Sequence, residues 1–299
     1  MSFSFETKNE LCRLPVQRLC CARAEAYGIL LYCNTFSPTE VRVVTENPNF
    51  AGRLPKLFHR AFGLRFDRRP EPGQEGKLVF QITEREKMDH IINLLGYDPR
   101  QNLVLHINFA MLEESCCRSA FLRGIFFAGG SITDPLKRYH LELATSHLQA
   151  SRELGVLLRE GGYPPKSVSR NGSFVTYFKQ SDQIEDFLTL IGAPVAAMNV
   201  MSAKMEKDLR NSVNRRLNCD SANLDKAVLA AQEQLEAIRR LQAAGILETL
   251  PDKLRQTAAL RLENPELTLS ELAEEFDPPV TKSCLNHRLR KLLELARRP

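Results

Sequence analysis

The sequence lacks the features that mark several large classes of protein. Its eight cysteines include no C-x-x-C pair, and no cluster of cysteine and histidine has the spacing of a zinc site. Adjacent cysteines such as Cys116 and Cys117 are poor ligand pairs. We therefore predict no metal and no cofactor, and we expect reduced thiols, as in cytosolic proteins.

We expect no export signal at the start of the chain. The stretch MSFSFETKNEL carries charged residues and no long apolar run, which excludes a secretory signal peptide. The longest apolar run near it, residues 27–33, is far shorter than the roughly 20 residues that span a bilayer. We expect a soluble, intracellular protein with no membrane partner.

The chain also lacks a strong excess of charge. It has 299 residues, 43% hydrophobic and 26% charged, with a net charge of +5. This composition is ordinary for globular proteins, and the length allows two or three domains. Such a mild positive charge permits nucleic-acid binding without arguing for it, so the local placement of charge matters more.

An internal repeat with a period near one hundred residues is the first feature present. The apolar segments AYGILLYCNTF (26–36) and LRGIFFAGGSI (122–132) align with Gly28 on Gly124, an offset of 96 residues. Each segment leads into a strand candidate that alternates between polar and apolar residues. These strands cover residues 40–45 and 139–145. Chance amphipathicity is the alternative to a true repeat.

The elements after these strands recur in the same order. A helix with an apolar stripe follows, at Leu54, Leu57, Phe58 and Ala61 and again at Leu154, Leu157 and Leu158. A strand over residues 77–83 or 172–179 comes next. A last helix ends at Gly96 or Gly192. Each half therefore reads helix, one or two strands, helix, strand, helix, which predicts an α+β fold.

Gly28 and Gly124 occupy equivalent positions inside the first helix of each half. Helices ordinarily pack with their axes about 8–10 Å apart, and a glycine on the contact face removes the spacer. An interior glycine lowers helix stability by up to about 1 kcal/mol relative to alanine. Its recurrence at the equivalent position of both helices therefore favours a role in helix packing. We predict a close crossing of the two helices on a pseudo-two-fold axis. A locally tolerated glycine is the alternative.

These halves resemble the single-chain LAGLIDADG homing endonucleases. In that family two αββαββα halves form a saddle of antiparallel strands on DNA, and the motif helices end in acidic residues that hold divalent metal. The resemblance places Cys33 and Gly129 at the acidic positions. Neither offers the hard oxygen ligands that Mg²⁺ requires, so we expect a retained fold without cleavage. An active endonuclease would need a displaced acid, such as Asp134 or Glu25.

A second module is expected after residue 220. A helix is predicted from about Leu224 to Ala244, with one apolar face formed by Val228, Ala231, Leu235 and Ile238. The polar segment 201–226 precedes it and clusters three arginines, at Arg210, Arg215 and Arg216. These arginines either contact DNA phosphates or form a solvated helix face.

The last two helices and the turn between them have the parts of a helix-turn-helix. Thr268 and Glu271 form a capping box that opens a short helix, and a Pro-Pro turn follows. The final helix, about 281–296, buries Leu285, Leu289, Leu292, Leu293 and Ala296. Its other residues predict contacts to base edges and phosphates. They are Thr281, Lys282, Ser283, Asn286, His287, Arg288, Arg290 and Lys291. A basic surface helix in a helical bundle is the alternative.

Over essentially its whole length the sequence resembles the WhiA family of Gram-positive bacteria. The residues that carry the resemblance are SFSFETKNELCRL (2–14), CCARAEAYGILLYC (20–33), FLRGIFFAGGSITDP (121–135), NCDSANLDK (218–226) and NHRLRKLLELA (286–296). The family joins a degenerate LAGLIDADG domain to a C-terminal helix-turn-helix. Its members are DNA-binding regulators of sporulation, cell division and chromosome segregation. Cys284 stands where a small residue such as glycine would be expected, which bears on base preference.

The resemblance implies a domain plan and a function. We predict a LAGLIDADG-like domain over residues 1–215, with halves at about 1–110 and 111–200, a linker at 216–225 and a helix-turn-helix domain at 226–299. We expect a monomeric, non-enzymatic, nucleoid-associated regulator of transcription in the cytoplasm. Its partners would be double-stranded DNA and other division or transcription proteins. A protein-interaction scaffold remains open, because the predicted saddle strands carry few charges.

Overall fold

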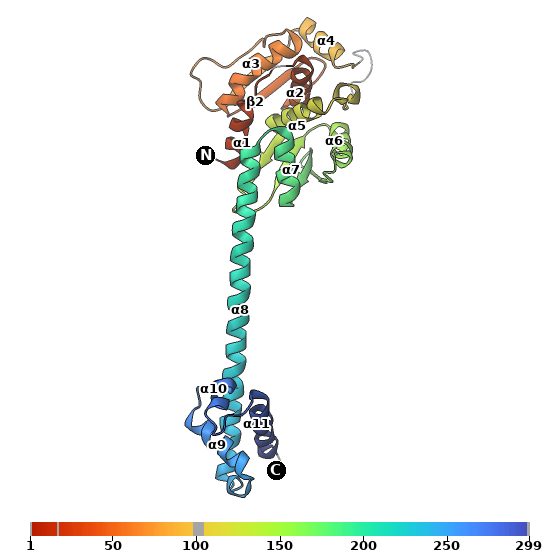
Figure 1. The fold of residues 1–299 in the computed structure, drawn as a ribbon. Coiled ribbons are helices and arrows are strands. Elements are labelled where there is room, and N and C mark those ends of the chain that lie inside the picture. Colours follow the sequence, from red (N-terminus) through yellow and green to blue (C-terminus); the bar gives the residue numbers. More distant parts are fainter. Residues whose placement is uncertain (1, 17, 98–104, 298–299) are drawn as a thin grey trace. The chain divides into compact units, whose positions relative to one another are not determined.

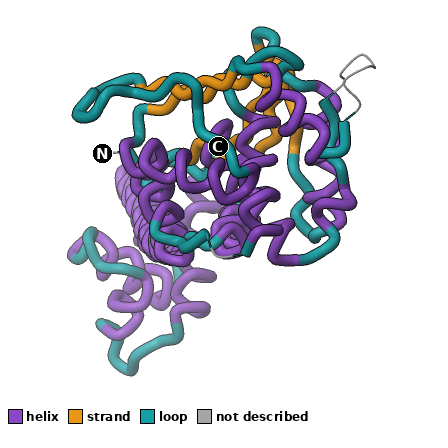
Figure 2. The backbone as a smooth tube through the Cα atoms, turned by 90° about the horizontal axis from the view of Figure 1, so that it is seen from above, coloured by secondary structure: helices purple, strands orange, loops and turns teal. Residues whose placement is uncertain are grey.

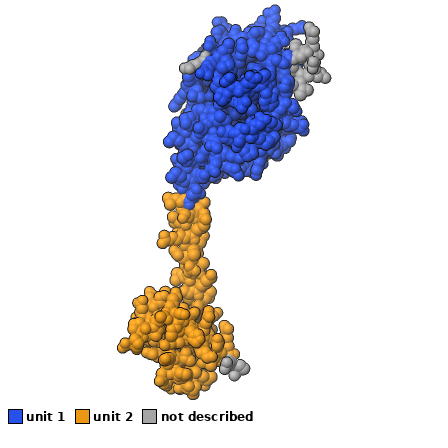
Figure 3. Space-filling view, turned by 45° about the vertical axis from the view of Figure 1, so that its right-hand side comes forward, with its two compact units in different colours: residues 1–208 blue, residues 209–299 orange. Residues whose placement is uncertain are grey.

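The computed structural model describes residues 2–16, 18–97 and 105–297. The chain divides into two compact units, unit 1 at residues 1–208 and unit 2 at residues 209–299 (Figure 3). Among the helices of the described chain, none combines the length and the apolar character needed to cross a membrane.

Unit 1 is built from two halves of the same design (Figure 1). The first half contains α2 (Leu19–Tyr32), β1 (Thr35–Phe36), β2 (Val41–Thr45), α3 (Pro48–Phe62), β3 (Leu78–Ile82) and α4 (Arg85–Leu94). The second contains α5 (Ser115–Gly129), β4 (Gly130–Ile132), β5 (Leu141–Thr145), α6 (Leu148–Glu160), β6 (Lys166–Arg170), β7 (Ser173–Phe178) and α7 (Ser181–Ile191). Helix α1 (Phe3–Cys12) precedes the first half, and the 3₁₀ helix η1 (Phe109–Leu112) precedes the second.

Each half carries one antiparallel sheet. The strand order is β1-β2-β3 in the first half and β4-β5-β7-β6 in the second. In residues 63–77, all of which are described, a single bridge between Arg68 and Gln81 takes the place of β6. The predicted αββαββα pattern is thus complete in the second half and one strand short in the first. Pro70 and Pro72 explain this, since proline cannot donate to a strand ladder.

The core of unit 1 lies between the sheets and the helices that cover one side of them (Figure 2). Alternation fixes the buried face of each strand: Val41 and Val43 are buried whereas Arg42 is exposed. The helix stripe Leu54, Leu57, Phe58 and Ala61 is buried throughout. Asn47 caps the helix that carries it, because its Oδ1 accepts a hydrogen bond from the Phe50 N–H at 2.9 Å.

Unit 2 is helical. Helix α8 (Pro194–Ala243) begins in unit 1, and η2 (Leu247–Thr249), α9 (Asp252–Glu263), α10 (Leu269–Glu274) and α11 (Lys282–Ala296) follow. The predicted linker at 216–225 is helical and lies within α8. The helix predicted from about Leu224 therefore begins some thirty residues earlier, because no glycine or proline interrupts residues 195–243.

Only the end of the predicted apolar face on α8 is buried. Val228 is 48% exposed, whereas Ile238 is fully buried and joins the core of unit 2. Leu241 contributes to the same core, together with Leu272 and Phe276 from the short helices. This change from exposed to buried along the helix means that the C-terminal turns of α8 belong to the helical fold of unit 2.

Candidate nucleic-acid interface

Helices α2 and α5 cross in backbone contact at the centre of unit 1. A Cβ on Gly28 would lie 2.2 Å from the Phe121 carbonyl oxygen, and one on Gly124 would lie 2.0 Å from that of Glu25. Glu25 and Phe121 are themselves 96 residues apart. The contacts are therefore reciprocal, as a pseudo-two-fold axis between the halves requires.

The C-terminal ends of these two helices border a cavity of about 390 Å³. It includes the two positions that the resemblance to homing endonucleases aligned with acidic residues. Cys33 and Gly129 line it, and none of the described residues around it is aspartate or glutamate. The cavity therefore offers a divalent ion no carboxylate from its own lining.

Cys33 and Gly129, the tip residues at the C-terminal ends of α2 and α5, both have structural roles. The Cys33 Sγ donates to the carbonyl oxygens of Leu30 at 3.2 Å and Thr35 at 3.1 Å. Burial raises the pKa of this thiol to about 12, so it stays protonated at neutral pH. At Gly129 a Cβ would lie 2.2 Å from the Ala144 carbonyl oxygen, which leaves no room for a side chain.

Neither of the acids considered as displaced ligands lines this cavity. Glu25 is 2% exposed and accepts from Arg53 at 2.7 Å and Arg123 at 2.9 Å. Its carboxylate thus joins α2, α3 and α5 through ion pairs. Asp134 lies in the loop after β4, where its Oδ1 accepts from the Leu136 N–H at 2.9 Å.

The sheets present one equivalent row of residues across their outer faces. In the first sheet the row runs from Thr35 through Arg42 and Gln81 to Arg68. In the second it runs from Ser131 through Glu142 and Tyr177 to Lys166. The first row carries two arginines and no acid, whereas the second pairs one lysine with one glutamate. The capacity to attract phosphates is therefore uneven between the halves.

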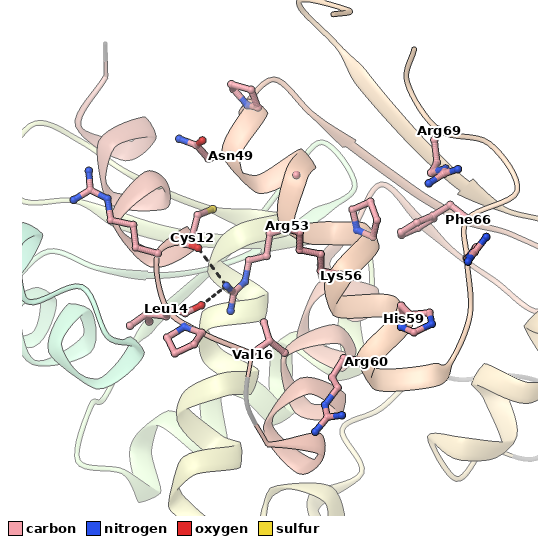
Figure 4. Close-up of a pocket in the computed structure, with 16 residues that line it drawn as sticks. Cys12, Leu14, Val16, Asn49, Arg53, Lys56, His59, Arg60, Phe66 and Arg69 are labelled. Carbon is pink, nitrogen blue, oxygen red and sulfur yellow. Dashed lines mark hydrogen bonds between the residues drawn. The ribbon is translucent and has the colours of Figure 1, made fainter. Parts of the chain in front are cut away.

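Unit 1 also has an open basic cavity that sequence reasoning missed. Its volume is about 1060 Å³, and it lies beside α3 and the segment that joins α1 to α2 (Figure 4). Its basic side chains are Arg13, Arg53, Lys56, His59, Arg60, Arg65 and Arg69. Such a concentration of positive charge can hold phosphate oxygens.

One of these arginines has a structural task. The Arg53 guanidinium donates to the Leu14 and Cys12 carbonyl oxygens, and its Nε to Glu25. Figure 4 shows it turned towards the α1–α2 connection. The helical spacing of Arg53, Lys56 and Arg60 was the available sequence signal, but it does not show that the 65–69 loop folds against the same face.

The predicted recognition helix in unit 2 forms as α11. Thr281 is its N-cap, since its Oγ1 accepts from the Cys284 N–H at 3.2 Å. Leu285, Leu289 and Leu292 are each at most 1% exposed and pack in the core with α10. The capping box of α10 is present, with the Thr268 N–H donating to Glu271 at 2.8 Å.

The residues predicted to contact DNA divide into two groups by exposure. Six of the predicted contacts on α11 and its cap are exposed: Thr281, Lys282, Ser283, His287, Arg290 and Lys291. Asn286 and Arg288 are half-buried. The Arg288 guanidinium lies 5.5 Å from the centre of the Phe276 ring, a cation–π contact that ties it to the end of α10.

The three arginines predicted upstream lie on a different element. They are exposed on the part of α8 that lies in unit 2, at Arg210, Arg215 and Arg216. Arg215 and Arg216 are adjacent and Arg210 is five residues earlier, so the three face different sides of the helix. Their role in phosphate contact stays a prediction.

Two family models match the chain. The model of the WhiA LAGLIDADG-like domain covers residues 118–210, and that of the WhiA C-terminal HTH domain covers residues 213–296. A protein of Ruminiclostridium cellulolyticum named "Probable cell division protein WhiA" is 37% identical over 310 residues. That alignment spans 100% of this chain and 98% of the relative.

Solved structures share the fold. The crystal structure of full-length WhiA from Thermatoga maritima matches with a TM-score of 0.61 and 22% identity, over 99% of this chain and 98% of that one. The N-terminal LAGLIDADG domain of WhiA matches with a TM-score of 0.51 and 19% identity, over 64% and 92%. The predicted fold class, LAGLIDADG-type halves followed by a helical helix-turn-helix, is confirmed.

Proposed function

The chain belongs to the WhiA family, and from this membership we propose that it is a non-enzymatic, DNA-binding regulator of transcription. The observation that carries the proposal is α11, which buries three leucines and turns Ser283, His287 and Arg290 to solvent. The name of the relative supports a role in cell division. We extend this role to chromosome segregation on the family resemblance.

Base recognition is assigned to the side of α11 that carries the exposed Arg290 and the half-buried Asn286. An arginine can donate two hydrogen bonds to the major-groove edge of guanine, and an asparagine can do the same with adenine, so Arg290 and Asn286 are the specificity residues. Thr281 and Lys282 at the helix start hold phosphates. Arg288 contacts the duplex backbone while its guanidinium stays over Phe276.

Unit 1 supplies backbone affinity in this proposal. The support comes from the arginines at positions 42 and 68 on the first sheet and from the basic cavity beside α3. Two modules of modest affinity in one chain gain through effective concentration, because binding of one raises the local concentration of the other at the duplex.

Cleavage is not part of the proposed function. The support is the tip cavity, where Cys33 is a buried thiol and Gly129 has no room for a side chain. The acids Glu25 and Asp134 are held elsewhere by hydrogen bonds. A nuclease of this class needs carboxylates at the tips to hold its metal.

Substitution Arg290→Ala tests the assignment of base recognition. In the full chain it should weaken binding to a preferred site by about 1–3 kcal/mol and relax sequence choice there. Arg239→Ala is the control, since Arg239 is exposed on α8 in the same unit. It should leave the sequence preference unchanged. If Arg290→Ala selects the same sites as the parent chain with equal affinity, α11 is not the recognition helix.

A scaffold role for unit 1 is the second candidate, and Glu142 favours it. This acid lies in the middle of the outer row of the second sheet, where it would oppose a phosphate backbone. Reversing the charge at Arg42 with Arg42→Glu distinguishes the two. Weaker duplex binding favours a DNA contact, whereas unchanged binding favours a surface that serves a protein partner.

A further inference from the structure

Four cysteines from the two motif helices meet at one end of the helix crossing. The Sγ atoms of Cys20, Cys21, Cys116 and Cys117 all lie within 4.8 Å of one another. The Cys20 and Cys21 sulfurs are 4.0 Å apart. Cys20 and Cys21 lie 96 residues before Cys116 and Cys117, which is the offset of the crossing glycines. The cluster therefore sits across the pseudo-two-fold axis, with two sulfurs from each half.

The size of the cluster fits a single tetrahedral ion. Zinc–sulfur bonds of about 2.3 Å place the four sulfurs of a Cys₄ site roughly 3.8 Å apart. The four thiols need to approach by no more than about 1 Å to reach that geometry. An iron–sulfur cluster would hold the same sulfurs farther apart, because iron and sulfide lie between them.

The local electrostatics acts in both directions. Burial raises the pKa of Cys21 to about 11 and also raises that of Cys117, whereas the hydrogen bond with Cys21 lowers the pKa of Cys116, so an ion must displace protons from the buried thiols. Each pair occupies the first turn of its helix, where backbone N–H groups and the helix dipole stabilise negative charge. Within the described chain, neither N-cap residue, Arg18 nor Glu114, caps its helix with a side-chain hydrogen bond. The Arg18 Nη1 lies 3.9 Å from the Cys116 sulfur and can offset part of the charge of a tetrathiolate.

The four cysteines differ in their exposure to solvent. Cys20 is exposed, Cys21 and Cys116 are half-buried, and Cys117 is buried. An ion can enter from solvent at Cys20 and be held against Cys117. The cavity at Cys33 and Gly129 lies at the other ends of the same helices, so this cluster is separate from the lost catalytic centre.

We propose that Cys20, Cys21, Cys116 and Cys117 bind one structural Zn²⁺ ion that ties the two halves of unit 1 together. As each Zn–S bond forms, the thiol releases its proton to the solvent. The ion acts as a staple between α2 and α5 at the helix starts. This assignment does not depend on the proposed DNA recognition by α11.

Metal analysis of the full-length chain, purified under reducing conditions, tests the proposal. We expect about one zinc ion per chain by mass spectrometry, as a Cys₄ site requires. Cobalt added to the metal-free chain should give the charge-transfer and ligand-field absorption of tetrahedral thiolate cobalt. Protein that remains free of metal after exposure to zinc, with no cobalt spectrum, would overturn it, and so would stoichiometric iron with sulfide.

Matched serine variants locate the ion. Cys116→Ser should lower zinc affinity by more than the roughly 10- to 100-fold that loss of a residue supporting a ligand costs. Cys219→Ser is the control, because Cys219 is an exposed cysteine of α8. Cys20→Ser alters the exposed ligand and serves if Cys116→Ser fails to fold. Zinc bound equally by Cys20→Ser and the parent chain contradicts the site.

A disulfide is the competing use of the same sulfurs. Thiol counting and peptide mapping of protein handled without oxygen distinguish the two. Four alkylatable thiols that become protected when zinc is added support the staple. A disulfide within the cluster in that material excludes it, because oxidised sulfurs are no longer thiolate ligands. Removing the ion with a chelator should also lower the thermal midpoint of the parent chain but not that of Cys20→Ser.

Discussion

Gly28 and Gly124 act through the side chains that they lack. Each lies where a Cβ would overlap the backbone of the opposite helix, and the overlap is with a carbonyl oxygen, which cannot move like a flexible side-chain end. The same logic applies at Gly129, where a Cβ would lie 2.2 Å from the Ala144 carbonyl oxygen. Single residues thus set the crossing geometry and leave no space for a side chain at Gly129.

Substitution Gly124→Ala should destabilise the chain. Its Cβ would lie 2.0 Å from the Glu25 carbonyl oxygen, so the helices must separate, at a cost of about 1–3 kcal/mol or more in the free energy of unfolding. Gly52→Ala is the matched control, since Gly52 lies within α3 with nothing within 4 Å of its Cβ position. That control should stabilise by up to about 1 kcal/mol. Equal urea midpoints for the two variants would contradict the close crossing.

Helix α10 shows how an element of six residues holds its place next to α11. Thr268 and Glu271 satisfy each other's backbone N–H groups, and Leu272 and Ala273 are buried in the core of unit 2. Helix α11 then begins eight residues after α10 ends, with the Val280 N–H donating to the Ala273 carbonyl oxygen at 3.0 Å. The capping box therefore supports the segment that positions α11.

Loss of the cap should weaken this element. Thr268→Ala removes the hydroxyl that accepts from the Glu271 N–H and should lower the free energy of unfolding by about 0.5–2 kcal/mol. Thr268→Ser keeps the hydroxyl and is the control. Chemical denaturation followed by circular dichroism measures both. A Thr268→Ala variant as stable as Thr268→Ser would show that the cap contributes nothing.

The same cap predicts a pH dependence with a definite sign. Hydrogen bonds from the Thr268 backbone N–H and side chain lower the pKa of Glu271 below its ordinary value of 4.5. A lowered folded-state pKa means that this stabilisation is present above pH 4.5 and is lost as the pH falls through the folded value. The stability of the parent chain relative to Glu271→Gln should therefore decline below pH 4.5. A constant difference across that range would contradict the assignment.

At the scale of the whole molecule, the repeat made most of the fold predictable. The offset of 96 residues aligned two apolar helices and the elements after them, because periodicity is a local property of the sequence. The β6 counterpart at Arg68 was not predictable in that way. The two prolines in residues 67–76 reduce a strand to one bridge, and a single bridge leaves no periodic pattern in the sequence.

The sites depended on contacts that spacing does not reveal. The cysteine pairs look unsuitable as ligands along the chain, and only the crossing of α2 and α5 brings their sulfurs together. The repeat offset contained that information, since the cysteines and the crossing glycines share it. The basic cavity likewise needed the fold, because Arg13, Lys56 and Arg69 come from three separate segments.

Electrostatic binding by the whole chain predicts a steep salt dependence. If cations of the chain neutralise DNA phosphates, the logarithm of the binding constant should fall linearly with the logarithm of salt concentration, by about 0.9 for each phosphate contacted. Fluorescence anisotropy of a labelled duplex over a series of salt concentrations measures the slope. A binding constant that does not change with salt would contradict phosphate contact.

Gel electrophoresis of supercoiled plasmid with the full-length protein and Mg²⁺ or Mn²⁺ tests the central claim most directly, since one gel reports both binding and cleavage. We predict a mobility shift that disappears when the protein is digested away, leaving supercoiled DNA intact. Nicked or linear plasmid after digestion, or no shift at any protein concentration, would contradict the account of a DNA-binding protein without nuclease activity.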